Sequence, residues 1–132
     1  MSEESFRKVK AYLQELKLPP TTEDTQEELF IVEDEESGIK NLIIDCEDPI
    51  LVLEQVILPV PPRPEKLFKR LLQINRTLVH GAFVLDEEAK MVLFRDTLQL
   101  TNLDLNELEG SINALSLALA ENAAELLSLC RE

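Results

Sequence analysis

The first stretch of the chain has the spacing of an amphipathic helix. Apolar side chains recur at intervals of three, four and three residues, which places them on one helical face: Phe6, Val9, Leu13 and Leu16. Ser2 is a favourable residue for the start of this helix. Pro19-Pro20 ends it, because proline cannot continue the helical hydrogen-bond ladder. The pattern predicts a short surface helix.

The next third of the chain changes to the pattern of short β-strands. Residues 21–26 are polar and are expected to be a linker. Apolar, β-branched runs follow at 29–32, 42–46 and 50–58, separated by acidic turns. Gly38 can supply the positive φ that the first hairpin turn needs. The segment predicts a three-stranded meander, and its poor alternation of polar and apolar positions predicts that both faces of the sheet are partly covered.

A second helix is expected from Glu65 to Val79, after a proline-rich connector. Its apolar positions fall in two adjacent sets, one of Leu67, Leu71, Ile74 and Leu78 and the other of Phe68, Leu72 and Val79. A stripe of this width is more than one contact with a sheet requires. Gly81 is expected to stop the helix.

The C-terminal third predicts a second hairpin and a long final helix. Residues 82–85 and 91–100 are the expected strands, joined by a polar turn. Asp104 and Glu107 have the spacing of a capping box, and the helix after them extends over about 26 residues. The order of elements is α-β-β-β-α-β-β-α. It predicts a single α+β domain over residues 1–132, with an antiparallel sheet packed by helices.

The charge of the chain limits its partners. It carries 13 Lys and Arg against 26 Asp and Glu, a formal net charge of −13. Nucleic acid and anionic membranes are therefore excluded as expected partners, because both require a basic surface. Residues 61–76 are the exception, with five basic residues against Glu65 alone. Either these cations solvate the helix edge, or the helix contacts the acidic surface of a second subunit in a homodimer, through Leu67, Arg70, Leu71, Ile74 and Leu78.

The residues that could perform chemistry are few. His80 is the only histidine and has no second ligand nearby in sequence, and the acidic run 33–36 lacks the alternating pattern of a calcium loop. The glycines are too dispersed for a phosphate-binding loop. Cys46 and Cys130 stand among apolar residues, which is typical of buried, reduced thiols. We expect no enzymatic activity, no metal and no cofactor. With no apolar leader and no membrane span, we expect a cytoplasmic location.

The pattern of nearly the whole chain resembles one family of proteins, and the C-terminal half carries most of the resemblance. The segments are 67–76 (LFKRLLQINR), Gly81 to Asp86 (GAFVLD), 91–98 (MVLFRDTL) and the long final helix. They are similar to the class I type III secretion chaperones and to their relatives, the YbjN-domain (CesT/Tir chaperone-like) proteins. The resemblance implies a non-enzymatic, ATP-independent dimer that holds an extended, unfolded segment of a client protein. The alternative is a YbjN-like structural or regulatory adaptor that binds a folded partner.

Under this resemblance, client contacts would come from the apolar face of the first helix and from the sheet. The candidates are Phe6, Val9, Leu13, Leu16, Phe30, Val32 and Ile44. Main-chain pairing with an added strand would supply affinity, and side-chain pockets would supply selectivity. The alternative interpretation is that these residues form the ordinary hydrophobic core.

Overall fold

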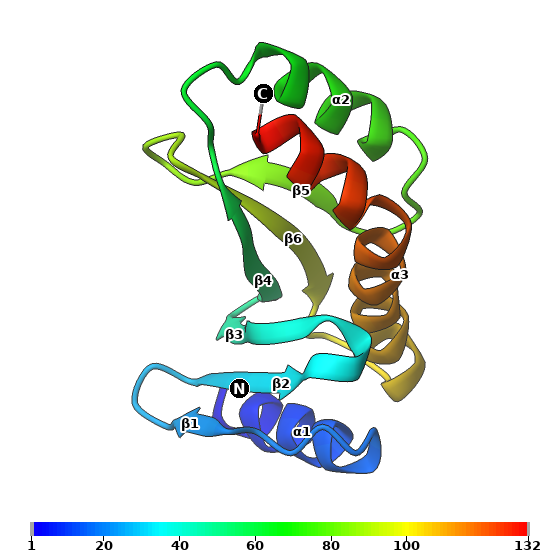
Figure 1. The fold of residues 1–132 in the computed structure, drawn as a ribbon. Coiled ribbons are helices and arrows are strands. Elements are labelled where there is room, and N and C mark those ends of the chain that lie inside the picture. The colour runs from blue at the N-terminus through cyan, green and yellow to red at the C-terminus, as the bar shows by residue number, and fades with distance from the viewer. Residues whose placement is uncertain (1, 132) are drawn as a thin grey trace.

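The elements lie close to the positions that the hydrophobic pattern predicts. The computed structural model describes residues 2–131. Along the chain the elements are α1 (Ser2–Glu15), β1 (Thr22–Asp24), β2 (Leu29–Asp34), the 3₁₀ turn η1 (Glu35–Ser37), β3 (Ile39–Glu47), β4 (Ile50–Pro59), α2 (Glu65–Asn75), β5 (Ala82–Leu85), β6 (Met91–Gln99) and α3 (Leu105–Cys130). Figure 1 shows their arrangement.

The strands form one six-stranded antiparallel sheet in the order β1-β2-β3-β4-β6-β5. The meander β2-β3-β4 is confirmed, with Phe30 paired to Ile44 and Ile44 to Leu53. The second hairpin joins it through β6, which pairs with β4 along nearly its whole length. The α+β class and the antiparallel sheet packed by helices are therefore confirmed.

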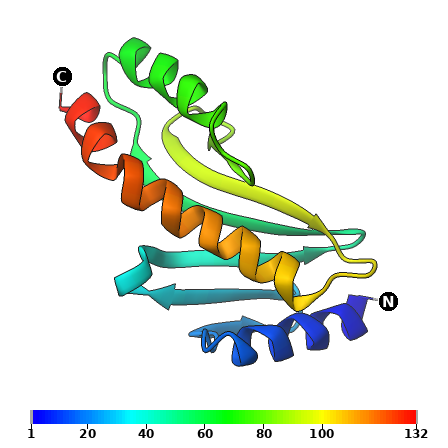
Figure 2. The ribbon, with the colours of Figure 1, turned by 90° about the vertical axis from the view of Figure 1, so that its right-hand side faces the viewer.

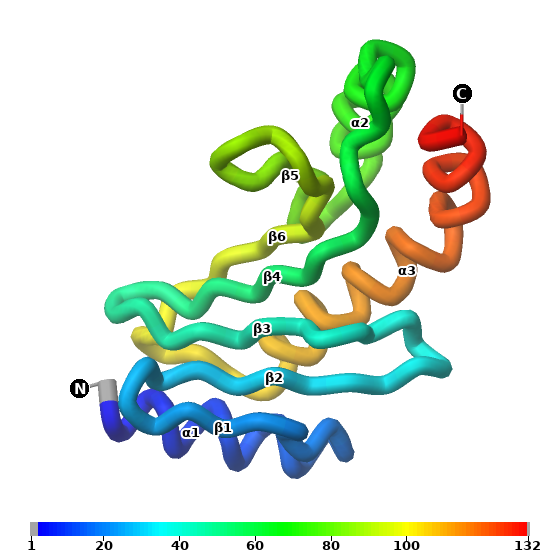
Figure 3. Tube along the Cα trace, turned by 60° about the vertical axis from the view of Figure 1, so that its left-hand side comes forward, coloured from blue at the N-terminus to red at the C-terminus, as the bar shows by residue number. Residues whose placement is uncertain are grey.

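Two expectations about the sheet are wrong. Residues 22–24, expected to be linker, form β1, which pairs with the start of β2. The side chain of Asp24 accepts hydrogen bonds from the backbone N–H groups of Gln26 and Glu27, and this tightens the turn between the two strands. The second error is that the sheet is covered on one face only: the ribbons place α1, α2 and α3 on the same side of it (Figures 2 and 3).

The covered face holds the hydrophobic core. Its buried strand residues include Phe30, Val32, Ile39, Leu42, Ile44, Cys46, Leu51, Leu53, Leu58, Phe83, Val92 and Phe94. The opposite, open face mixes aliphatic and charged residues, which include Leu29, Ile31, Ile43, Val52, Glu54 and Arg95. Glu54 and Arg95 form an ion pair across β4 and β6, 3.1 Å between oxygen and nitrogen. The poor alternation therefore reflects aliphatic residues on a face that no helix covers.

The second helix is shorter than expected, and Gly81 does not stop it. It ends at Asn75, where the side-chain amide donates to the carbonyl of Phe83 and the side-chain carbonyl accepts from the Phe83 N–H, at 3.0 and 2.8 Å. The carboxamide thus occupies the backbone groups of β5 much as a neighbouring strand would. Gly81 has a φ of +76° and would place a Cβ within 2.5 Å of the Phe94 ring, so glycine is needed for the entry into β5.

The final helix begins as predicted, and its two ends contact different helices. Asp104 accepts from the Glu107 N–H, and the Glu107 side chain accepts from the Asp104 N–H, so the capping box is confirmed. The Tyr12 hydroxyl donates to the Leu103 carbonyl, which ties α1 to the start of α3. The C-terminal half of α3 lies beside α2 (Figure 1), where Arg70 and Glu125 form an ion pair at 2.7 Å.

The Asn75 bridge predicts a measurable loss of stability. In Asn75→Ala, the N–H and carbonyl of Phe83 lose their partners, so the free energy of unfolding in urea should fall by about 2 kcal/mol. The matched control is Gln73→Ala, an exposed position on the same helix, which should change it by less than about 0.5 kcal/mol. Equal effects of the two substitutions would contradict a role of Asn75 in holding β5.

Candidate binding surfaces

The residues expected to contact a client form the interface between α1 and the sheet. Six of them are buried: Phe6, Val9, Leu13, Phe30, Val32 and Ile44. The rings of Phe6 and Phe30 stack with their centroids 4.3 Å apart and their planes 8° apart. Leu16 is partly buried. A partner could reach these side chains only if α1 moved off the sheet.

The residues expected at a dimer interface are used mostly inside the chain. Leu67, Leu71 and Ile74 are buried, and Leu78 is partly buried against the core. The Arg70 side chain is directed to Glu125 of α3. The second apolar set is mostly outside: Leu72 is 73% exposed and Val79, in the loop after α2, is 88% exposed, whereas Phe68 is partly buried against the core. The two sets that the sequence distinguishes therefore separate into an inner and an outer surface.

Three adjoining cavities lie in a row along α3, on the side next to the β2–β3 turn. We call this row the α3 trough. The first, of about 220 Å³, is lined by residues that include Asp34, Ser37, Glu109, Asn113, Ser116 and Lys17. The second, of about 720 Å³, shares Ser37, Asn113 and Ser116 with the first and is also lined by Glu35, Glu36, Leu117 and Ala120. The third, of about 260 Å³, shares Gly38, Leu119 and Ala123 with the second and is also lined by Val56, Leu58 and Leu127.

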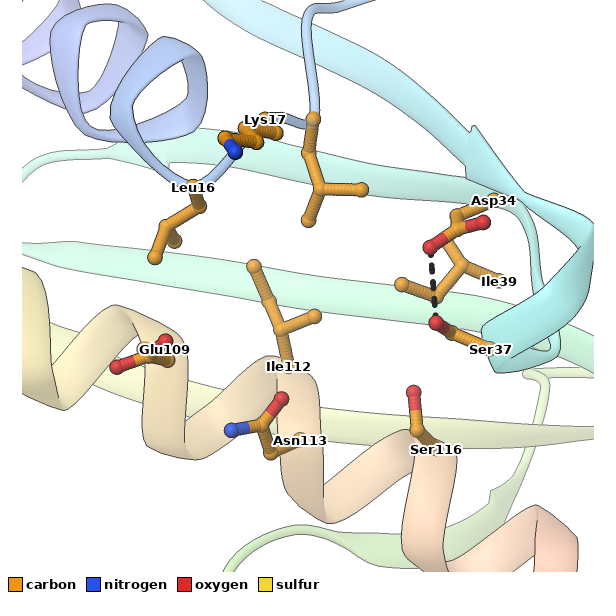
Figure 4. A pocket seen from close by; sticks show the side chains of 10 residues that line it. Leu16, Lys17, Asp34, Ser37, Ile39, Glu109, Ile112, Asn113 and Ser116 are labelled. Carbon is orange, nitrogen blue, oxygen red and sulfur yellow. Dashed lines mark hydrogen bonds between the residues drawn. The ribbon is translucent and has the colours of Figure 1, made fainter.

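The trough changes character along its length. At its first end, the polar side chains of η1 and α3 face one another, with the Ser37 hydroxyl bonded to Asp34 at 2.8 Å (Figure 4). At its other end the lining is mostly aliphatic, with Lys40 and Gln55 as its polar members, and Leu127 is 48% exposed. Leu117, which lines the second cavity, is 60% exposed. A long groove with this lining suits a peptide segment better than a compact small molecule.

The opening of the trough follows from the sheet. The pairing of β3 with β4 ends at Ile43 and Glu54, just after Asn41 adopts a φ of +51°. Beyond that point the buried Gln55 side chain replaces the missing strand contact, accepting from the Lys40 N–H and donating to the Gly38 carbonyl, both at 3.0 Å. The edge of β4 after Glu54 is therefore without a strand partner on the β3 side.

Four carboxylates gather where β1, β2 and β3 meet. The pKa of Asp45 is raised above its ordinary value, first by burial and then by the negative charges of Glu47, Glu27 and Glu28. The folded chain therefore binds a proton at Asp45 more tightly than the unfolded chain does. The stability linked to that proton is present below the usual pKa of 3.8 and is lost as the pH rises through the raised pKa.

The side chains that could react or bind a metal, the two cysteines and His80, do not form a common site. The pKa of the buried Cys46 thiol is raised to about 12, chiefly by burial. Cys130, expected to be buried, is only partly so, and its thiol donates to the Pro59 carbonyl. His80 lies exposed in the loop after α2. Among residues 2–131, no three His, Cys, Asp or Glu side chains are grouped to hold a metal, and no helix is long and apolar enough to span a membrane.

The chain is similar to a known protein family and to several solved structures. The model of the CesT_Tir_1 family matches residues 2–132. The solved structure of YbjN from E. coli superposes with a TM-score of 0.69 at 16% identity, over 90% of this chain and 91% of that one. A chain of the heterodimeric ExoU–SpcU complex, from the type III secretion system of Pseudomonas aeruginosa, gives 0.68 at 17% identity, over 92% and 97%.

A further similar structure is a chain of the HopA1–SchA chaperone–effector complex, with a TM-score of 0.63 at 14% identity, over 87% of this chain and 91% of that one. At these identities the likeness establishes the fold. A comparison with curated proteins finds no match to this chain.

The charge cluster at Asp45 predicts a pH-dependent gain of stability. Asp45→Asn removes a carboxylate that is costly to ionise, so at pH 7 the midpoint of urea unfolding should rise. The gain should disappear towards pH 3, where both side chains are neutral. Glu87→Gln, in the exposed β5–β6 turn, is the control and should show little change at either pH. A gain of equal size at pH 3 would attribute the effect to packing of the amide and not to charge.

Proposed function

Since the chain belongs to the CesT_Tir_1 family, we propose that it is a non-enzymatic protein-binding module that holds an extended, unfolded segment of a client without ATP. The observation that carries the proposal is the amount of apolar surface left outside a well-filled core, on α2, on α3 and on the open face of the sheet. Single exposed aliphatic side chains are common, but those that gather in one patch, as Val56, Leu117 and Leu127 do along the second and third cavities, mark interaction sites. A type III secretion client is one possibility within this proposal, and the cytoplasm is the proposed location.

The alternative is a YbjN-like structural or regulatory adaptor whose partner is folded. It is supported by the likeness of the fold to YbjN, at a TM-score of 0.69. The two functions differ in the state of the partner: a holding module prefers an unfolded segment, whereas an adaptor recognises a preformed surface. One experiment therefore distinguishes them.

We also propose a homodimer whose interface is the outer surface of α2 and the loop after it, in place of the residues expected from the sequence. Leu67, Leu71 and Ile74 are occupied within the chain, which leaves Leu72, Val79 and the partly buried Phe68 for a second copy. Lys69 of α2 and Arg76, directly after its end, are exposed, and the rest of the chain is acidic. Their positive charge would favour a second, negatively charged copy. A symmetric dimer would pair this surface with itself or with an adjacent acidic one.

The holding function predicts selective binding of an unfolded chain. Lysozyme that is reduced and capped with a neutral alkylating agent should bind at least about tenfold more tightly than native lysozyme in the absence of nucleotide, as measured by fluorescence anisotropy. The two forms share nearly the same sequence and charge, so a simple attraction to the acidic surface would not separate them. Equal binding of both forms would exclude the holding function and leave the adaptor.

The dimer predicts a mass of about twice 15.0 kDa by light scattering on a size-exclusion column, at low and at moderate salt. Leu72→Glu should convert the dimer to a monomer, because it places a charge in an apolar contact. Leu117→Glu, the same change at an exposed leucine of α3, is the control and should remain dimeric. The proposed α2 interface would be wrong if the parent chain were a monomer, or if Leu117→Glu and not Leu72→Glu gave a monomer.

A further inference from the structure

We propose that the α3 trough binds an extended segment of a partner protein that carries aliphatic residues at one end and basic residues at the other. The inference rests on the proposed function as a protein-binding module, and adds where one segment binds and what chemistry selects it. It uses a surface apart from the buried α1 face and from the outer surface of α2.

The length of the trough fits an extended segment. Its lining residues on α3 run from Glu109 to Leu127, a distance of about 27 Å at 1.5 Å per residue. About eight residues of extended chain cover that distance. The edge of β4 after Glu54, which has no strand partner on the β3 side, borders the aliphatic end. An extended segment can use such an edge through its backbone, whereas a helix cannot.

The aliphatic end supplies apolar contact. Val56, Leu119 and Leu127 line it together with the small side chain of Ala123, which lines both the second and the third cavity. Ala123 leaves room between α3 and the sheet, and side chains from alternate positions of a bound segment would fill that room. Gly38 and Leu119 line both the second and the third cavity, so the two cavities adjoin at this point.

The other end supplies negative charge. Asp34 and Glu109 line the first cavity, and Glu35 and Glu36 line the second. The cation that faces them is Lys17, at the end of α1. Among residues 2–131, Glu35, Glu36 and Glu109 form no ion pair, so these carboxylates are available to Lys or Arg of a partner. Charge complementarity therefore selects a basic end for the segment, and a segment with an acidic end is repelled.

The test uses labelled synthetic peptides of about twelve residues, with alternating leucine and serine followed or preceded by arginines. The basic peptide should bind at least about tenfold more tightly than the same peptide with glutamates for arginines, or with serines for leucines, by fluorescence anisotropy. Ala123→Arg should weaken binding about tenfold or more, because it fills the aliphatic end. Ala124→Arg, the same change on the exposed side of the helix, should leave the Kd within about twofold.

Two double variants of equal net charge test the acidic end. The double variant Glu35→Lys, Glu36→Lys should bind the basic peptide more weakly, and the Kd should depend less on salt. Glu87→Lys with Glu88→Lys, in the exposed β5–β6 turn, changes the total charge equally and should have little effect. Equal effects of the two pairs would mean that general attraction, and not the trough, binds the peptide.

The outcomes separate the trough from the proposed function. If unfolded lysozyme binds but Ala123→Arg and Ala124→Arg behave alike towards it and towards the peptides, the trough is not the site and the holding function remains. If Ala123→Arg instead dissociates a dimer in light scattering, the occupant is a second copy and the inference is overturned. If neither unfolded lysozyme nor peptide binds, both proposals fail together.

Discussion

The packing of helices on one face of the sheet is the constraint on which the rest of the structure depends. A six-stranded sheet has two faces, and here α1 and the first half of α3 cover the same one, with the stacked Phe6 and Phe30 rings at one side and Leu108, Ile112 and Leu115 along the middle. Burying that face provides most of the hydrophobic stabilisation. It also leaves three apolar regions outside: the open sheet face, the outer surface of α2 and the aliphatic end of the trough.

Side-chain amides complete the sheet where strand pairing ends. Asn75 bonds to the backbone of Phe83 in β5, and Gln55 bonds to Lys40 and Gly38 where β3 leaves β4. Both satisfy backbone groups that would otherwise lose hydrogen bonds. Their consequences for binding are opposite. Asn75 occupies backbone groups of β5 that an added strand would need, whereas Gln55 ties the start of β3 to β4 at a point where β4 itself has no strand partner on the β3 side.

The distribution of charge gives these surfaces different preferences. The basic residues of α2 lie beside exposed leucine and valine, whereas the carboxylates of η1 and α3 lie at one end of the trough. A net charge of −13 alone would attract any cation. The positions of the charges give the two surfaces different preferences. The outer surface of α2 suits a second, acidic copy, and the trough suits a segment with basic and aliphatic residues. Both proposals follow from where the charges lie relative to apolar contacts and not from their sum.

Local spacing in the sequence determined the elements: the stripe from Phe6 to Leu16 is α1, and Asp104 with Glu107 starts α3, because helix periodicity and capping act over a few residues. It also distinguished the two apolar sets of α2. Only the tertiary structure decided which set is inside, that residues 22–24 become a strand, that Asn75 and not Gly81 marks the end of α2, and that η1, α3 and β4 enclose a trough. Those outcomes depend on contacts between residues far apart in the chain, which no local pattern encodes.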